Sequence, residues 1–358
     1  MSGTSYRSSG DFRSSYQKEE PLIDTSGMRM ATIVFVIVLL ICPILLNVYH
    51  LSILIQIGYF GIAALGLNIL VGYTGQISLG HAAFFGFGAF TSAYLNNEMG
   101  VPVFFAIPLA GLVTTVVGML FGAPAARIRG LYLAIATFAA EIILEDFFGR
   151  AEWFTGGAAG ALASPFSIFG YEAATDQTYL YVIIAYSVLL TVFAANLLRT
   201  RDGRALIAVR DHYLSAEIMG INLTRYRIMS FGISSFYAGI GGALMVHYFS
   251  FVSSESITIL LSIQFLAMVI IGGLGTIKGA WLGAAFMVMM PEMLESGVSL
   301  VKDGGYAEQL PWLTTGVEFM KEAMIGLVII AFLIFEPRGL AYLWHLIRAS
   351  WKRYPFSY

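Results

Sequence analysis

Cysteine and charge are both scarce in this chain of 358 residues. Cys42 is the single cysteine, and charged residues make up 12% of the chain, against about 25% in soluble domains. One cysteine excludes a disulfide framework and a CxxC metal site. The low charge leaves too few polar side chains to cover the surface of a soluble protein of this length, so the soluble globular class is excluded as well.

The sequence also lacks the patterns that bind nucleotides, metals and nucleic acids. Its five histidines show no ligand spacing. Lys278 follows Ile277, and no Ser or Thr comes next, so the glycine-rich stretch around it is not a phosphate-binding loop. The basic residues flank apolar runs and form no groove-sized surface. We therefore expect no cofactor, no metal, no nucleic-acid partner, no ATP binding and no enzymatic activity on this chain.

Apolar residues are abundant instead, at 58% of the chain with a mean hydropathy of +0.77. A membrane-spanning helix needs about 20 apolar residues, and ten runs approach that length. They cover about 30–48, 51–71, 79–95, 102–124, 131–148, 179–198, 229–250, 259–273, 279–295 and 318–335. The sequence predicts an all-α, polytopic bundle of eight to ten transmembrane helices, because 51–95 could hold a broken helix and 259–295 a re-entrant pair.

Lysine and arginine are distributed unevenly between the two sides of such a bundle. With the N-terminus inside and the sides alternating, Arg150, Lys302 and Lys321 fall outside, and the other 17 of the 20 fall inside. Basic residues concentrate on the cytoplasmic side of membrane proteins. We therefore predict a multi-pass membrane protein with both termini in the cytoplasm.

The predicted membrane domain, 29–338, is flanked by two polar segments. Residues 1–28 are rich in Ser, Gly, Tyr and charge, a composition that predicts a disordered cytoplasmic tail. Residues 339–358 carry Trp344, Trp351 and Tyr354 among basic residues. That pattern predicts a helix lying in the inner membrane interface. A simple stop-transfer tail is the alternative.

The polar loop at 199–228 is the most distinctive segment. It holds six arginines: Arg199, Arg201, Arg204, Arg210, Arg225 and Arg227. Inside it, Ser215 to Asn222 has the pattern of a short helix that ends at Gly220. A helix on the basic side of a membrane protein predicts docking to another polypeptide. The alternative, a loop whose arginines only set the topology, does not explain the helix.

Two glycine-rich segments interrupt the apolar runs. The first, 72–81, contains Gly72, Tyr73, Gly75, Gln76, Ser78, Gly80 and His81. Polar groups and loosened backbone at membrane depth favour a substrate pathway or gate, and a polar turn between packed helices is the alternative. The second, 272–279, contains Gly272, Gly273 and Gly275 at an offset of 200 residues from the first. This echo indicates either a distant internal repeat or convergent use of glycine.

Glu141 is the clearest buried charge, because it lies in the middle of the apolar run 131–148, one helical turn before Glu145. An acid inside a membrane is a candidate functional residue. It could hold a substrate ammonium group or orient a gate. A structural acid that is hydrogen-bonded inside the bundle, or one in an outer vestibule, is the alternative.

Several of these segments together resemble the branched-chain amino acid ABC transporter permeases, and their order resembles the M-type subunit. The segments are Asn68 to Phe90, Gly130 to Phe138, Thr155 to Gly157, Gly203 to Asp211, Ala216 to Asn222, Val269 to Gly275 and Phe335 to Leu340. The chain departs from the family after Gly157, where it reads Ala158-Ala159 and the family more often has a bulkier residue.

The resemblance implies a subunit of an importer that moves Leu, Ile and Val across the bacterial inner membrane by alternating access. The implied partners are a homologous second permease subunit in a heterodimer, two cytoplasmic ATP-binding subunits and a periplasmic amino-acid-binding protein. A permease for urea or short amides, and an ion-coupled secondary transporter that uses Glu141, remain alternatives.

The resemblance also distributes roles among the candidate residues. It makes the helix from Ala216 to Gly220 the one that couples to the ATPase. The implied coupling set is Arg204, Arg210, Asp211, Ala216, Glu217, Gly220 and Asn222. The candidates for the substrate pathway or gate are the polar and glycine residues of 72–81 and 272–275, together with Glu141 and the outer-loop residues Thr155, Gly156 and Gly157.

Overall fold

The computed structural model describes residues 26–128, 130–168, 171–173, 175–303, 317–336 and 338–353. The longer helices are α2 (Ser26–Leu45), α3 (Val48–Asn68), α4 (His81–Asn97), α5 (Val103–Ala125), α6 (Leu131–Arg150), α8 (Asp176–Arg199), α9 (Arg201–Asp211), α11 (Leu223–Phe249), α12 (Ile259–Gly272), α13 (Ile277–Asp303), α15 (Val317–Phe335) and α16 (Leu340–Arg353). The short ones are η1 (Ile69–Tyr73), α7 (Glu152–Thr155), η2 (Gly157–Ala159), α10 (Tyr213–Ile218) and η3 (Ser254–Ser256).

Strands are few and very short in the described part of the chain. β1 (Ala161–Leu162) pairs antiparallel with β4 (Phe251–Val252), and β2 (Ser167–Ile168) pairs antiparallel with β3 (Tyr171–Glu172). The predicted all-α helical bundle is therefore confirmed. Helices cover most of each of the ten apolar runs, because lipid cannot satisfy backbone N–H and C=O groups and a helix satisfies them within one segment.

The number of transmembrane helices is smaller by a strict test. Within the described residues, five helical segments are both long and apolar enough to cross a membrane: Val48–Tyr73, Val103–Ala125, Asp176–Arg199, Leu223–Phe249 and Ser254–Gly272. Parts of α15 and α16, Ala323–Phe335 and Leu340–Ile347, pass the test together but are bent by 49°, so they count as a sixth only if the two form one broken span. Helix α4 has only 17 residues, and α6 carries three acids. The predicted total of eight to ten spans requires that shorter or more charged helices, such as α4 and α6, cross the membrane as well.

Helix α11 runs through the bundle against α3, α4 and α5. Small residues allow the close approach: a Cβ atom on Gly88 would lie 2.3 Å from the Cα of Gly239, and one on Gly242 would lie 1.8 Å from the carbonyl oxygen of Phe85. Close backbone contact of this kind is typical of helix packing in membranes, where the hydrophobic effect does not drive helices together.

Helices α12 and α13 pack together in the same way. A Cβ atom on Gly272 would lie 1.9 Å from the carbonyl oxygen of Gly279, and one on Gly283 would lie 1.7 Å from that of Met268. The glycines of the segment 272–279 therefore have a packing role on this helix pair, whatever further role they have.

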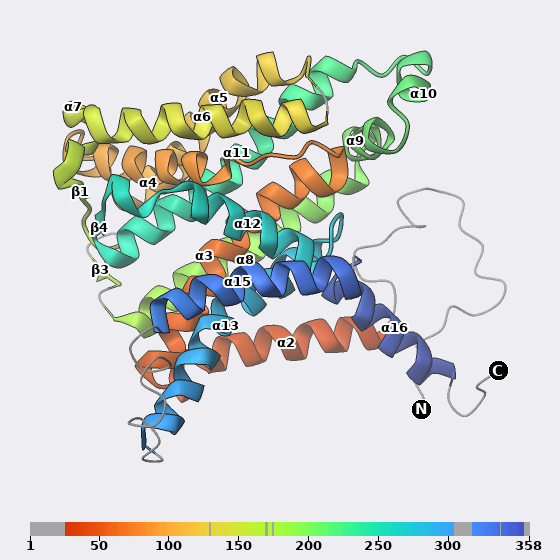
Figure 1. Cartoon of the computed structure of the whole chain (residues 1–358). Helices are drawn as coiled ribbons and strands as arrows, with labels where there is room; N and C mark the ends of the chain where they lie inside the picture. The colour runs from red at the N-terminus through yellow and green to blue at the C-terminus, as the bar shows by residue number, and fades with distance from the viewer. Residues whose placement is uncertain are drawn as a thin grey trace.

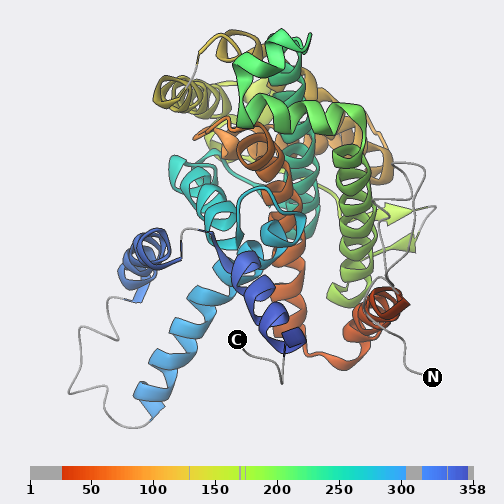
Figure 2. The same ribbon diagram turned by 90° about the vertical axis from the view of Figure 1, so that its right-hand side faces the viewer.

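The connecting segments gather at opposite ends of the bundle. Figure 1 shows α7, β1, β3 and β4 at one end, and α9, α10 and α16 at the other. The turn of Figure 2 brings the end with α9 and α10 toward the viewer. Of the predicted tail, 1–28, only the last three residues are described, and they begin α2. The C-terminal segment is helical from Leu340 to Arg353, with Trp344 and Ile347 exposed.

Candidate functional site

The helix break predicted within 51–95 lies at the end of α3. There the chain widens into the π-helix η1, and the hydroxyl of Thr74 donates to the carbonyl oxygen of Leu70 at 2.5 Å. Gly75 then has a φ of +69°, a conformation that favours glycine. No helix forms again before His81. A π-helical turn of this kind often marks a functional site.

Polar side chains in the break are buried and bonded to α11. The Nε2 atom of Gln76 donates to the hydroxyl oxygens of Ser230 at 2.6 Å and Thr74 at 2.9 Å. Among the described residues, its Oε1 atom has no hydrogen-bond partner. Ser78 is buried as well. The break is thus a built polar connection and not a solvated turn.

Glu141 bonds to the first turn of α4. Its Oε2 atom accepts hydrogen bonds from the backbone N–H of Ala83 and the hydroxyl of Ser262, both at 3.0 Å. The Ser262 oxygen in turn accepts the N–H of Ala82 at 2.8 Å. The amides of the first turn of a helix have no partner within their own helix. Gly80, at the N-cap of α4, has no side chain that could accept their hydrogen bonds, so Glu141 and Ser262 accept them instead. A carboxylate there also complements the positive end of the helix dipole.

The remaining contacts of the break fix where α4 begins. The hydroxyl oxygen of Thr137 accepts the N–H of Leu79 at 2.9 Å, and a Cβ atom on Gly80 would lie 2.3 Å from the Thr137 carbonyl oxygen. His81 donates from Nε2 to the carbonyl oxygen of Ala63 at 2.9 Å, and its ring stacks edge-on against Phe265. His81 is therefore a buried link between α3 and α4.

The two glycine-rich segments meet, although they are far apart in sequence. A Cβ atom on Gly72 would lie 2.3 Å from the backbone nitrogen of Gly275. Asn68 holds the contact from both sides: its Nδ2 donates to the carbonyl oxygen of Thr276 at 2.7 Å, and its Oδ1 accepts the N–H of Gly275 at 2.8 Å. Gly273 and Gly275 have positive φ angles of 119° and 72°. Tyr73 is the last residue of η1 and directly follows Gly72.

The short helix predicted before Gly220 is present as α10. Gly220 has a φ of +86°, its N–H donates to the carbonyl oxygen of Glu217, and the N–H of Ile221 donates to that of Ala216, both at 3.0 Å. This is the geometry in which a left-handed glycine ends a helix. Asn222 then caps α11 by accepting the N–H of Arg225.

Helix α10 is held by a small apolar cluster and leaves an apolar tip exposed. Val209 of α9, Ala216 of α10 and Leu223 of α11 are buried against one another. At its end, Ile218 is 85% exposed, and Met219, which follows α10, is 82% exposed. Exposed apolar side chains grouped on one small helix are typical of a surface that binds another protein.

The arginines of the loop have different positions. The guanidinium of Arg210 reaches the break, where Nη1 donates to the carbonyl oxygen of Gly72 at 2.6 Å. Its Nε pairs with Asp211 at 2.8 Å. Arg204 donates from Nη1 to the carbonyl oxygen of Arg199 at 3.3 Å. Arg210 is therefore a predicted coupling residue that contacts a predicted gate residue.

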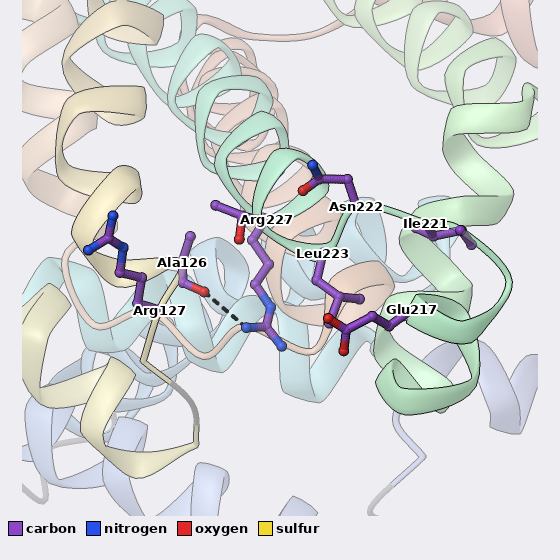
Figure 3. Close-up of a pocket in the computed structure, with 9 residues that line it drawn as sticks. Ala126, Arg127, Glu217, Ile221, Asn222, Leu223 and Arg227 are labelled. Atoms are coloured by element: carbon purple, nitrogen blue, oxygen red, sulfur yellow. Dashed lines mark hydrogen bonds between the residues drawn. The ribbon is translucent and has the colours of Figure 1, made fainter.

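A groove of about 430 Å³ lies between α10 and the end of α5 (Figure 3). The side chains of Glu217 and Arg227 point toward one another across it, and Arg227 donates from Nη1 to the carbonyl oxygen of Ala126 at 2.9 Å. Arg127 and Gly220 also line it. The groove is thus formed where the loop meets the bundle.

The outer-loop candidates do not join the others. The hydroxyl of Thr155 donates to the carbonyl oxygen of Phe148 at 2.6 Å and accepts the N–H of Gly157 at 3.1 Å, while Gly156 and Gly157 have φ angles of +72° and +63°. These residues shape the turn between α7 and η2, at the end of the bundle opposite α10 (Figure 1). Ala158 and Ala159 belong to η2.

Sequence reasoning missed Asn68, Thr137, Ser230, Ser262 and His247, all of which are buried. His247 contacts the hydroxyl oxygen of Ser92 at 2.8 Å and the carbonyl oxygen of Ser164 at 2.7 Å, so it ties the outer loop to α4 and α11. The available signal was a polar residue inside an apolar run, since such residues must find a partner within the protein.

Comparison with known protein families finds a match to the family described as "Branched-chain amino acid transport system / permease component", over residues 49–333. No solved structure matches this chain significantly.

Individual relatives point the same way. The chain is 34% identical to the high-affinity branched-chain amino acid transport system permease protein LivM of Salmonella typhimurium, over 65% of this chain and 60% of the relative. It is 26% identical to a probable LivM of Methanocaldococcus jannaschii, over 82% and 89%. It is 23% identical to the LivH permease of Escherichia coli, over 64% and 79%. The match thus spans about 60% of the length of the Salmonella relative.

Proposed function

This chain belongs to the branched-chain amino acid transport permease family, and we propose that it is a membrane-spanning subunit of an ABC importer for Leu, Ile and Val. The observation that carries the proposal is the position of α10. It is a helix on an arginine-rich loop, buried on one face against its own loop and exposed on the other, and it lies at one end of a bundle of apolar helices.

We propose that an ATP-binding subunit docks on the exposed face of α10. Burial of an exposed Ile or Met side chain contributes about 1.5–3 kcal/mol, so Ile218 and Met219 together would supply a substantial part of an interface. The groove beside α10 lies between the docking helix and α5, so a shift of α10 against α5 would change its width. Two such ATP-binding subunits would serve this chain and a second permease subunit.

The similarity to both LivM and LivH relatives supports pairing with a homologous second permease subunit. We place the assembly in a bacterial inner membrane with both termini in the cytoplasm, because that orientation puts 17 of the 20 basic residues inside. A periplasmic amino-acid-binding protein would then dock at the end that carries α7, β1 and β4. Helix α16 would lie in the inner interface.

We propose that the contact between the segments 72–81 and 272–279 is the inner gate of the pathway. It has the features of a broken membrane helix: a π-helical turn, backbone in conformations that favour glycine, and buried polar side chains. Alternating access requires such a contact to open while the opposite end closes. Glu141 holds the first turn of α4 in place beside this break, a positioning role that needs no contact with substrate.

Co-purification from native membranes in mild detergent tests the proposal. Ile218→Glu places a charge on the exposed face of α10, where it leaves the core intact. Met99→Glu is the matched control, because Met99 is 61% exposed between α4 and α5, away from α10. We expect ATP-binding subunits to accompany the wild type and Met99→Glu and to be lost from Ile218→Glu.

Uptake assays on the same preparations separate the rival functions. Vanadate-sensitive uptake of labelled leucine supports the proposed importer. Uptake of urea in place of leucine would instead assign the chain to the amide branch. Transport that resists vanadate and collapses with a protonophore, without any associated ATP-binding subunit, would refute the proposal and favour an ion-coupled transporter.

A further inference from the structure

Arg210 joins three segments that lie far apart in the sequence. It belongs to α9, and its Nη1 atom donates to the carbonyl oxygen of Gly72 at 2.6 Å. A Cβ atom on Gly275 would lie 3.0 Å from that same Nη1 and 3.0 Å from the Gly72 carbonyl oxygen. The guanidinium therefore sits at the point where the loop, the end of α3 and the turn after α12 converge.

Glycine makes the space that this guanidinium occupies. A Cβ atom on Gly75 would lie 3.1 Å from the Cγ of Arg210, and Gly75 and Gly275 both have positive φ angles. Three glycines thus surround the side chain, two of them in conformations that other residues rarely adopt. The space between these glycines accommodates a long, planar cation against exposed backbone. A smaller or branched side chain would not fill this space.

The electrostatics favour an arginine at this position. The carbonyl groups at the end of a helix have no partner within the helix and carry partial negative charge. Gly72 lies in the last turn of η1, so its oxygen is such an acceptor. The pairing of Arg210 Nε with Asp211 at 2.8 Å orients the guanidinium and leaves Nη1 directed at Gly72.

The link continues on both sides of Arg210. On one side, Val209 is the neighbour of Arg210 in α9 and packs in the small cluster with Ala216 of α10. A shift of α10 therefore moves the backbone that carries Arg210. On the other side, Asn68 bonds both Gly275 and Thr276, so a shift of the Gly72 region is passed to the turn after α12.

We infer that Arg210 is the positioning residue that transmits the motion of α10 to the contact between Gly72 and Gly275, and that its bond to the Gly72 carbonyl oxygen couples ATP hydrolysis to gate opening. The inference rests on the proposed function, because it assumes that α10 is moved by an ATP-binding subunit. It adds a specific route, in which the loop acts on the broken end of α3 directly and not through the long transmembrane helices.

The test uses the full complex in proteoliposomes, with ATP hydrolysis and leucine uptake measured on the same sample. Arg210→Gln removes the charge and the paired donors, Arg210→Lys keeps the charge, and Arg201→Gln is the control, because Arg201 is exposed at the opposite end of α9. We expect Arg210→Gln to assemble and hydrolyse ATP but to move about tenfold fewer leucine molecules per ATP, a factor typical of coupling between sites. Arg210→Lys should be intermediate, and Arg201→Gln should match the wild type.

Hydrogen exchange supplies a readout that a merely structural role would not change. In the wild type, trapping with vanadate and nucleotide should alter exchange of the backbone amides at 73–80 and 273–276. In Arg210→Gln we expect no such response, although α10 remains bound to its partner.

The possible failures are distinguishable. If Arg210→Gln moves as much leucine per ATP as the wild type, the inference is wrong and the proposed function stands. If no ATP-binding subunit accompanies the wild type, both are wrong. If Arg210→Gln does not assemble, Asp211→Asn decides: Asp211 is exposed, and its loss should lower leucine moved per ATP without loss of assembly. An unchanged ratio in that variant would overturn the inference.

Discussion

Replacement of Glu141 by alanine and by glutamine separates its structural role from a direct role in transport. The side chain is fully buried, and its Oε2 atom accepts the N–H of Ala83 and the hydroxyl of Ser262. Glu141→Ala removes this acceptor and leaves both donors buried without a partner. Glu141→Gln keeps an oxygen of the same reach, so an amide carbonyl can accept from the same two donors.

The two variants should differ clearly in stability. A buried donor left without an acceptor costs about 1–3 kcal/mol, so Glu141→Ala should lose about 2–6 kcal/mol over its two donors. Glu141→Gln should lose about 1 kcal/mol, the size of a charge effect at a helix N-terminus. We expect the melting temperature in detergent to fall by about 3–8 °C for alanine and to change little for glutamine.

The assay combines melting of the purified protein, followed by tryptophan fluorescence, with leucine uptake by the reconstituted complex. If Glu141 only positions α4, Glu141→Gln should retain most of the uptake and most of the stability. Our reasoning is refuted if Glu141→Ala melts like the wild type, or if Glu141→Gln keeps its stability but abolishes uptake. Either result would make the carboxylate a ligand for substrate or for a coupling ion.

Two further predictions concern packing. Gly88→Val should prevent stable folding, because a Cβ atom there would lie 2.3 Å from the Cα of Gly239. Gly149→Ala is the control: its Cβ atom meets open space inside a helix, so the variant should be neutral or stabilised by up to about 1 kcal/mol. Yields and melting temperatures in detergent check both variants, and normal folding of Gly88→Val would contradict the close crossing of α4 and α11. His247→Leu should release the outer loop from Ser164, which would appear as faster hydrogen exchange at 161–168 with unchanged exchange in α10, and an unchanged outer loop would show that the histidine does not hold it.

Apolar length and local stop signals were enough to predict the helices. Helices cover most of each of the ten apolar runs, because backbone groups in lipid are satisfied most simply within one segment. The end of α10 at Gly220 was also predictable, because a glycine in the left-handed conformation is a local signal. The interruption near Gly72 could be read from polar residues and glycines between two apolar runs.

Which segments meet could not be read from the sequence. Three contacts join distant parts of the chain: Gly72 with Gly275, Arg210 with Gly72, and Glu141 with the first turn of α4. Periodicity describes one helix face at a time and does not name its partner. For the same reason Asn68 was missed, although it bonds both Gly275 and Thr276.

The sequence by itself determined that this protein is a bundle of apolar helices with a basic, helix-bearing loop, because burial in lipid and helix termination depend on residues close together in the chain. Only the tertiary structure decided that Glu141 caps α4 and that Arg210 bonds to the break. Both outcomes depend on which donors and acceptors the folded chain brings within about 3 Å of one another, and that is a property of helix packing and not of any single segment.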